Sequence, residues 1–243
     1  MISESDGHYL FKADRTEADR VYLDESETRH LRSVLRVQEG DTAFVTLGQG
    51  HIYRVEIESF QDGGCVGKVR EKQTPRAVEP EMDFYVGLPD KTRFDQMLEL
   101  LVPLGIRSVT PVECKYCQKK WWTKRWGKKE ERFQRKIVAS AKQSWNARFP
   151  RLSSPLSFEV SLERASGELL LADPEGTKIE DVELRSGTTN SYSCFVGPPG
   201  GFSPDEKEAL ETNGAVKIWI SPFRLRTELA AAILAGLLVS RFG

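Results

Sequence analysis

The first third of the chain contains segments in which apolar and polar residues alternate, the pattern of half-buried strands. These segments are residues 43–47, 52–60 and 65–70. Glycine-containing turns at 48–50 and 62–64 separate them, and a short helix is expected before them at 27–37, where apolar residues share one helical face. A run of short antiparallel strands of this kind predicts a small β-barrel.

From residue 82 onward, short apolar segments alternate with segments of helical period. Strands are predicted at residues 82–86, 108–112, 169–172, 194–196 and 215–220, and helices at 93–104, at 127–145, after Ser203 and over 229–238. Alternating strands and helices form a mainly parallel sheet covered on both faces. We therefore expect two domains, residues 1–74 and 80–243, joined by a linker that contains Pro75 and Pro80.

The last fifth of the chain contains two similar units, each a strand followed by a loop and a helix. The first loop contains Gly197, Gly200 and Gly201, whose lack of a Cβ permits close approaches of the backbone. Residues 203–206 after it read Ser-Pro-Asp-Glu, a capping-box signature of a helix start. The second loop spans residues 221–226. Because such loops meet at the carboxyl edge of an α/β sheet, where ligands bind, they predict one crevice.

The spacing of these glycines does not match the common nucleotide fingerprints. Gly197-Pro-Pro-Gly-Gly does not fit G-x-G-x-x-G, and the glycines near residue 64 lack the Walker A spacing. All three histidines lie before residue 52 and the α/β domain has no G-x-S-x-G elbow, which disfavours a hydrolase.

Together the two loops carry a specific set of residues. Gly197-Pro-x-Gly-Gly-x-Ser-x-x-Glu206, followed by Leu225-Arg-Thr-Glu-x-Ala230, resembles the RsmE family of small-subunit (16S) ribosomal RNA uridine-N3 methyltransferases. Residues 30–41 are similar to the family's N-terminal signature, and the match extends to Gln143, Ser144, Arg148 and Pro150. The resemblance implies an α/β domain of the SPOUT class with a trefoil knot, beside a smaller N-terminal PUA-like β-barrel that binds RNA. It also implies S-adenosylmethionine as the cofactor.

By this resemblance, three loops hold the cofactor through backbone groups that read adenine and apolar contacts that enclose it. The implied residues are Leu171, Ala172, Asp173, Gly197, Pro198, Gly200, Gly201, Ile220, Ser221, Pro222 and Leu225. For Leu171 and Ile220, the residues themselves leave open a simple place in the core at a strand end.

The resemblance implies two catalytic residues, Arg226 and Glu228. Arg226 can hold an RNA phosphate or stabilise the negative charge that develops on uracil as N3 loses its proton. Glu228 can orient the base or accept that proton. An acidic residue near a helix N-terminus also interacts favourably with the helix dipole, so a purely structural role for Glu228 stays open.

Positive charge is concentrated in one segment. The net charge of the chain is −1, but residues 115–136 contain ten Lys and Arg residues with aromatic residues between them. Clustered cations track phosphates and aromatic rings stack on bases, although a solvated helical face gives the same pattern. The residues expected to bind RNA are Arg15, Arg20, Arg32, Arg36, Lys119, Lys120, Lys124 and Arg148.

The chain departs from the family pattern at Pro103, Lys142, Asn146, Pro199 and Leu229. Pro199 stands where the family usually has Glu, and Leu229 where it usually has Thr. These departures motivate an alternative function, an RNA-binding or ribosome-assembly protein of the same fold that is catalytically weak or inactive. An unrelated nucleotide-binding α/β enzyme is a third possibility.

Cys114 and Cys117 are the one closely spaced pair among the four cysteines. A zinc site needs two further ligands and a redox site a supporting motif, so neither is predicted. The chain begins without a secretory signal pattern, and the apolar run at 229–239 is shorter than the roughly 20 residues that span a bilayer. We therefore expect a cytoplasmic protein with no metal and no membrane partner.

Small residues dominate the last helix, 229–238. Ala and Gly side chains let helices approach closely, and the helix is apolar nearly all round, which indicates burial on more than one side. We predict a homodimer through this helix, in agreement with SPOUT family dimerisation. A helix buried in the core of its own chain is the alternative.

Overall fold

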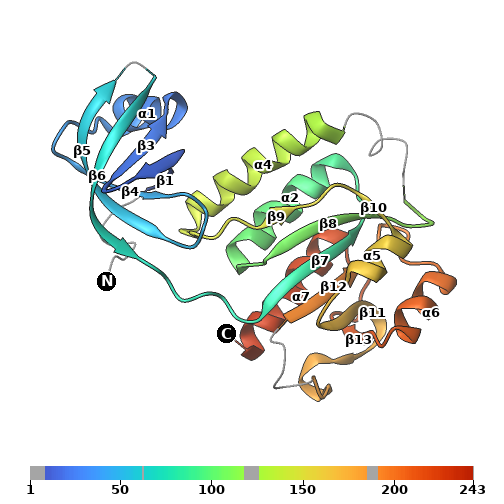
Figure 1. The fold of residues 1–243 in the computed structure, drawn as a ribbon. Helices are drawn as coiled ribbons and strands as arrows, with labels where there is room; N and C mark the ends of the chain where they lie inside the picture. Colours follow the sequence, from blue (N-terminus) through green and yellow to red (C-terminus); the bar gives the residue numbers. More distant parts are fainter. Residues whose placement is uncertain (1–8, 62, 118–125, 185–190, 243) are drawn as a thin grey trace. The chain divides into compact units, whose positions relative to one another are not determined.

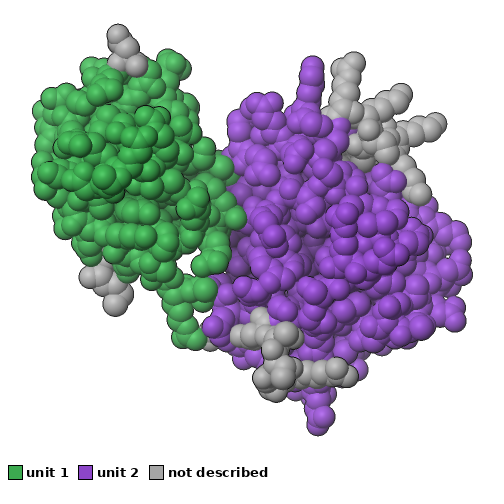
Figure 2. All heavy atoms as spheres, in the orientation of Figure 1, with its two compact units in different colours: residues 1–77, 138–149 green, residues 78–137, 150–243 purple. Residues whose placement is uncertain are grey.

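The computed structural model describes residues 9–61, 63–117, 126–184 and 191–242 (Figure 1). The chain forms two compact units, Met1–Ala77 with Val138–Phe149, and Val78–Ile137 with Pro150–Gly243 (Figure 2). Residues 138–149, which the sequence assigns to the second domain, therefore group with the first unit. The reason is packing at long sequence separation, since the Trp145 ring lies 5.5 Å from that of Phe44 and Lys142 forms an ion pair with Glu27.

The first unit contains a curled six-stranded sheet. Its strands are β1 (Leu10–Lys12), β2 (Arg15–Glu17), β3 (Arg20–Asp24), β4 (Thr42–Thr46), β5 (Ile52–Gln61) and β6 (Gly64–Gln73), in the order β1-β4-β5-β6-β3-β2. Neighbouring strands are antiparallel except β1 and β4, which are parallel. The alternation of apolar residues correctly predicts β4 to β6, whose Val45 and Val55 are fully buried beside Val21 of β3.

The helix expected at 27–37 is two short helical segments, α1 (Glu25–His30) and a π-helical turn, η2 (Leu31–Leu35). Asp24 caps α1, because its side chain accepts a 2.8 Å hydrogen bond from the N–H of Glu27. Arg36 ends the segment in the left-handed conformation with φ 57°. Leu31 is fully buried and attaches the turn to the core of the sheet.

The second unit is built on a seven-stranded sheet, as the alternation of strands and helices predicts. Its strands are β7 (Glu81–Gly87), β8 (Ser108–Glu113), β9 (Arg151–Leu152), β10 (Leu156–Ser157), β11 (Glu168–Lys178), β12 (Ser191–Val196) and β13 (Val216–Trp219). The order is β10-β8-β7-β12-β11-β13, with β9 also on β8, and every pairing is parallel. Phe84 and Tyr85 point to opposite faces of β7 and are both buried, so both faces are covered.

Helical segments follow these strands along the chain. They are α2 (Lys91–Leu101), the 3₁₀ turn η3 (Val102–Leu104), α4 (Trp126–Gln143), α5 (Phe158–Arg164), the 3₁₀ turn η4 (Ile179–Asp181), α6 (Pro204–Thr212) and α7 (Thr227–Phe242). Pro103 lies in η3, and Gly105 ends it with φ 73°, so this departure from the family pattern terminates α2. On one face, Phe158 of α5 and Leu210 of α6 pack with Tyr85 and Phe195. Helix α7 packs against α2, β7 and β12.

Candidate functional site

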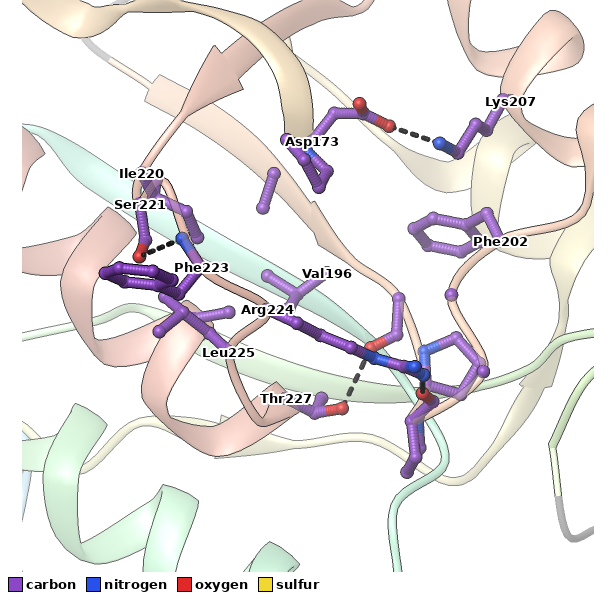
Figure 3. Close-up of a pocket in the computed structure, with 18 of the residues that line it drawn as sticks. Asp173, Val196, Phe202, Lys207, Ile220, Ser221, Phe223, Arg224, Leu225 and Thr227 are labelled. Carbon is purple, nitrogen blue, oxygen red and sulfur yellow. Dashed lines mark hydrogen bonds and ion pairs between the residues drawn. The ribbon is translucent and has the colours of Figure 1, made fainter.

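Three neighbouring strands end at the same edge of the parallel sheet, and the chain loops after them enclose a pocket of about 490 Å³ (Figure 3). The first loop is a bulge in β11, because Ala172 and Thr177 both pair with Ile218 of β13. Residues 173–176 therefore lie outside the pairing of β11 with β13, next to the pocket. The other two loops follow β12 and β13, as the two repeated strand–loop–helix units predict. The sheet edge thus brings together segments that are far apart in sequence.

Close backbone contacts explain the glycines of the loop after β12. A Cβ on Gly197 would lie 3.1 Å from the Cα of Gly201, and a Cβ on Gly200 would lie 2.8 Å from the Cβ of Tyr116. Gly201 has φ 77°, and its N–H donates a 2.7 Å hydrogen bond to the carbonyl of Pro198. The loop is therefore a tight turn that larger residues would force apart.

The capping box predicted at the start of α6 is confirmed. The N–H of Glu206 donates to Ser203 Oγ at 3.3 Å, and the N–H of Ser203 donates to the Glu206 carboxylate at 2.8 Å. The other carboxylate oxygen of Glu206 accepts a 2.7 Å hydrogen bond from the N–H of Lys115. Helix α6 thus starts at a fixed point directly after the glycine loop.

The loop after β13 is tied to the glycine loop by two hydrogen bonds. Thr227 Oγ1 donates to the carbonyl of Gly197 at 3.0 Å, and the Arg224 guanidinium donates to the carbonyl of Pro199 at 2.5 Å. Within its own loop, the N–H of Phe223 donates to Ser221 Oγ at 3.1 Å. These contacts fix the shape of the pocket wall, as Figure 3 shows.

An ion pair lies at the opposite side of the pocket in Figure 3. Lys207 of α6 approaches the carboxylate of Asp173 to 2.6 Å, and the Asp173 side chain is only 2% exposed. Both residues line the pocket. The pair compensates the charge of a buried carboxylate beside the glycine loop, and it links the β11 bulge to α6.

Ten of the eleven expected cofactor residues line the pocket; they are Ala172, Asp173, Gly197, Pro198, Gly200, Gly201, Ile220, Ser221, Pro222 and Leu225. Leu171 does not line the pocket, because it is fully buried and packs with Phe195 in the core. A place in the core at a strand end was the alternative that the sequence left open for Leu171. The sequence analysis missed lining residues such as Phe202, Lys207, Phe223, Arg224 and Thr227. Phe223 and Arg224 lie inside the loop 221–226, which the sequence predicts to bind a ligand, and this position was the signal that they line the pocket.

Arg226 and Glu228 lie beside the pocket and do not line it. Arg226 is exposed, and its carbonyl accepts a hydrogen bond from the N–H of Ala230 in the first turn of α7. Glu228 is 6% exposed, and its Oε2 atom has no hydrogen-bond partner within the part of the chain that the structure describes. A buried carboxylate oxygen without a hydrogen-bond donor is energetically costly.

The residues expected to bind RNA fall into two groups. Arg15, Arg20, Arg32, Arg36 and Arg148 lie in the first unit, whereas Lys119, Lys120 and Lys124 lie outside the described residues. Arg20 pairs with Glu58 at 2.6 Å, and Arg15 pairs with Glu17 at 3.1 Å. Arg32 lies over the Phe60 ring at 5.1 Å. These contacts hold the exposed arginines on the sheet of the first unit.

The Lys142 and Asn146 departures have local roles in the first unit. Lys142 approaches Glu27 to 2.6 Å with side-chain exposures of 19% and 13%, and it also lies over the Phe11 ring. The Asn146 side chain accepts a 2.9 Å hydrogen bond from the N–H of Arg148. Lys142 therefore fastens residues 138–149 to the rest of the first unit, whereas the Asn146 contact stabilises the turn within this segment.

Cys114 and Cys117 occupy one turn at the end of β8. Cys117 Sγ accepts a 3.3 Å hydrogen bond from the N–H of Cys114, and Cys114 is fully buried. Among the described residues, His, Cys, Asp and Glu form no group of three or more that could hold a metal ion. No helix in the described ranges is both long and apolar enough to cross a membrane.

Comparison with known protein families identifies the family of this chain. Residues 77–239 match the family described as RNA methyltransferase domain, and residues 23–69 match the RNA methyltransferase PUA domain. The chain belongs to the RNA methyltransferase family. The resemblance to the RsmE family is thereby confirmed, and the curled sheet of the first unit is PUA-like.

Curated relatives of this RNA methyltransferase carry the name ribosomal RNA small subunit methyltransferase E. The protein from Mycobacterium bovis is 28% identical over 219 residues, covering 88% of this chain and 84% of its own, and that from Aquifex aeolicus is 27% identical over 237 residues, covering 96% and 99%. A Neisseria gonorrhoeae protein of the same name, crystallised with S-adenosylmethionine, has the same fold with a TM-score of 0.85 at 20% identity, covering 97% of this chain and 98% of its own.

Proposed function

We propose that this RNA methyltransferase transfers the methyl group of S-adenosylmethionine to N3 of a uridine in small-subunit ribosomal RNA. The observation that carries the proposal is the pocket formed by the three strand-end loops, because it gathers ten of the residues that the family resemblance implies. The names of the curated relatives support the ribosomal substrate. The trefoil knot implied by the SPOUT resemblance belongs to the same proposal.

The pocket residues fit the proposed cofactor. A volume of about 490 Å³ lies within the usual range of small-molecule sites. Val196, Ile220 and Leu225 provide apolar surface for a purine, and the carbonyl groups and N–H groups of the tight loops provide hydrogen bonds. Asp173 and Lys207 provide charged groups for a ligand that itself carries an amino acid. When bound, S-adenosylmethionine supplies a methyl group on a positively charged sulfur.

Arg226 and Glu228 act on the acceptor side in this proposal. Uracil N3 carries a proton at neutral pH, so its lone pair becomes available only when that proton leaves. The Glu228 carboxylate, with one oxygen unpartnered among the described residues, accepts the proton, and the Arg226 guanidinium stabilises the uracil anion. Both residues lie at the start of α7, immediately beside Thr227 and Leu225 of the pocket wall.

RNA is held outside the pocket by cationic surfaces. The arginines of the first unit and the basic segment 115–136 contact phosphates in the small ribosomal subunit, which places the enzyme in the cytoplasm. We also propose a homodimer through the exposed part of helix α7, where Leu229 is 44% exposed; Ala231, Leu234 and Leu238 of the same helix are buried within the chain, as the alternative of an intrachain core helix expects. Sedimentation of the wild type and of Leu229→Glu tests this, because a monomeric wild type at micromolar concentration contradicts the dimer.

The decisive test of the reaction is incubation with methyl-labelled S-adenosylmethionine and unmodified small ribosomal subunits, followed by mass spectrometry of RNA digests. We expect one labelled N3-methyluridine. A ribose 2′-O-methyl product contradicts the N3 assignment and leaves the methyltransferase assignment intact. RNA binding without incorporation supports the alternative of a catalytically inactive RNA-binding protein.

A further inference from the structure

Phe223 presents an aromatic ring to solvent at the pocket wall. It is 80% exposed, the largest exposure among the large apolar side chains of the described residues. Its backbone is anchored, because its N–H donates to Ser221 Oγ and the next residue, Arg224, is hydrogen-bonded to Pro199. A solvent-exposed ring on an anchored loop beside a binding pocket is available to contact a ligand with an apolar face.

Arg224 places a cation next to that ring. Its side chain runs from its own loop toward the glycine loop (Figure 3), where it donates to the neutral carbonyl of Pro199. A guanidinium has five N–H donors, and no ion pair of Arg224 with a carboxylate occurs among the residues that the structure describes. Among the described residues, the pocket wall therefore carries a positive charge that no carboxylate neutralises, and a bound anionic group would complement it.

A nucleotide of unpaired RNA has the complementary chemistry. An enzyme that modifies a base must take that base out of its stack, which leaves the two faces of the base without contacts. Proteins replace these contacts by stacking aromatic side chains on the base, and Arg pairs with the neighbouring phosphate. An aromatic ring followed by a cation matches the flat base and anionic phosphate of one nucleotide.

We propose that Phe223 and Arg224 bind the acceptor nucleotide of the RNA, with the Phe223 ring stacked on the uracil and the Arg224 guanidinium on its phosphate. The proposal rests on the proposed function, since it takes the acceptor to be a pyrimidine in RNA. It assigns substrate positioning to two residues of a loop whose neighbours, Ser221 and Leu225, line the pocket proposed for the cofactor.

The test measures binding of the full-length protein to a single-stranded RNA oligonucleotide that contains one uridine, together with S-adenosylmethionine affinity by calorimetry. We expect Phe223→Ala to weaken RNA binding by roughly 5- to 100-fold, the range found for a lost base-stacking ring, and to weaken it by more than it weakens cofactor binding. Phe223→Trp should restore binding. Phe223→Leu should not, because it keeps apolar area without an aromatic face. Restoration by Leu, or unchanged binding in Phe223→Ala, overturns the proposal.

Arg224 is tested by salt dependence. Losing one phosphate contact should make the plot of log affinity against log salt concentration less steep by about 0.7 in Arg224→Ala. Arg164→Ala is the matched control, because Arg164 is an exposed cation of α5 that does not line the pocket. An equal change in both variants, or none in Arg224→Ala, overturns the phosphate contact.

The same variants separate this inference from the proposed function and from a dimer contact. A wild type that binds the oligonucleotide through Phe223 but yields no N3-methyluridine contradicts the proposed function alone. Normal methylation and normal RNA binding by Phe223→Ala contradict this inference alone. Loss of cofactor affinity together with dissociation to monomers in Phe223→Ala overturns it too, since the ring would then be covered by a second copy.

Discussion

Thr227 Oγ1 donates a 3.0 Å hydrogen bond to the backbone carbonyl of Gly197, so the first residue of α7 is fastened to the first residue of the glycine loop. Thr227 is 3% exposed, and both residues line the pocket. Because the two loops have no covalent link near this point, the hydrogen bond helps to set the width of the pocket between them.

We predict that Thr227→Val lowers S-adenosylmethionine affinity about 5- to 10-fold. Val has the shape of Thr without the hydroxyl, so the partly buried carbonyl of Gly197 loses its donor at a cost of about 1 kcal/mol or slightly more. Thr227→Ser, which keeps the hydroxyl, should bind normally. Thr212→Val at the exposed end of α6 is the control, and equal affinities for all variants in calorimetry would contradict the role of this contact.

Lys207 and Asp173 should be energetically coupled. Removing the lysine leaves the 2% exposed Asp173 carboxylate without its ion-pair partner, so we expect Lys207→Met to lower the free energy of unfolding by about 2 kcal/mol. Asp173→Asn in the same chain removes that buried charge, and the double variant should be more stable than the sum of the single changes predicts. Urea unfolding of the four proteins measures the coupling. Strictly additive changes would show that the pair contributes nothing.

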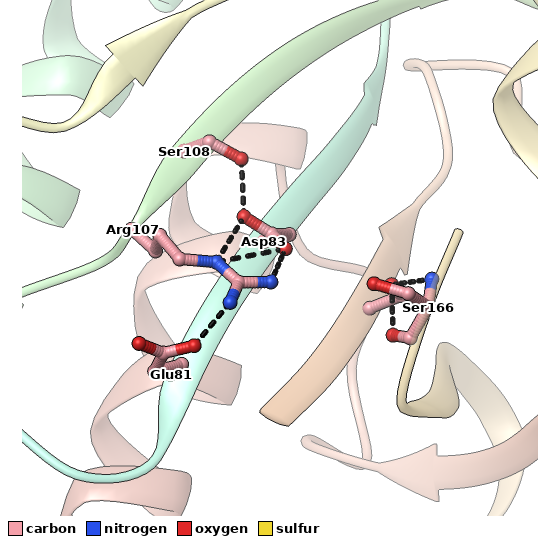
Figure 4. A network of polar contacts seen from close by, with 6 residues as sticks. Glu81, Asp83, Arg107, Ser108 and Ser166 are labelled. Carbon is pink, nitrogen blue, oxygen red and sulfur yellow. Dashed lines mark hydrogen bonds and ion pairs between the residues drawn. The ribbon is translucent and has the colours of Figure 1, made fainter. Parts of the chain in front are cut away.

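Asp83 of β7 joins Arg107 and Ser108 in a polar network at the amino end of the sheet (Figure 4). Burial alone raises the pKa of the Asp83 carboxyl, but hydrogen bonds from Arg107 and Ser108 and the charge of Arg107 outweigh it, and the net pKa is lowered. The folded-state pKa therefore lies below the unfolded value of about 3.9. The stabilisation is present above pH 4 and is lost as the pH falls through the folded pKa.

We therefore predict that Asp83→Asn lowers stability at pH 7 by about 2 kcal/mol and makes stability less dependent on pH between 4 and 2. Thermal unfolding at pH 7 and at several values between pH 4 and pH 2 measures both effects. Asp181→Asn, at an exposed position in η4, should follow the wild-type curve. If the stabilities of Asp83→Asn and of the wild type changed with pH in parallel, the acid sensitivity would come from groups other than Asp83.

The cysteines should differ in reactivity. Hydrogen bonding to the Cys114 side chain and to the N–H of Cys114 lowers the pKa of the Cys117 thiol, whereas burial raises the pKa of Cys65 to about 11 and also raises that of Cys194. The thiolate is the reactive form, so iodoacetamide at pH 7 should modify Cys117 at least tenfold faster than Cys65. Peptide mass spectrometry over time measures the rates. Faster labelling of Cys65 or Cys194 in the folded protein would contradict this ranking.

Local signals explain why the pocket was predicted. The glycine loop, the capping box at Ser203 and the neighbouring strands each depend on residues that are close together in the sequence. The parallel sheet follows from the alternation of strands and helices. Strands β1 to β3 were missed; β1 and β2 span only three residues each, too few to show a period. The grouping of Lys142 with Glu27 joins residues 115 positions apart, and no local pattern encodes such a contact.

The last prediction concerns Glu228, whose carboxylate is buried at the first turn of α7 with one oxygen unpartnered among the described residues. If it accepts the N3 proton, Glu228→Gln should lower single-turnover methylation by about 10²- to 10⁴-fold, with S-adenosylmethionine affinity unchanged. The rate of the variant should rise with pH up to 9, as deprotonated uracil becomes more abundant. If Glu228 only stabilises the helix dipole, Glu228→Gln should lose about 0.5 kcal/mol of stability and methylate normally across this pH range. Rates and unfolding measured on the same preparations decide between the two roles.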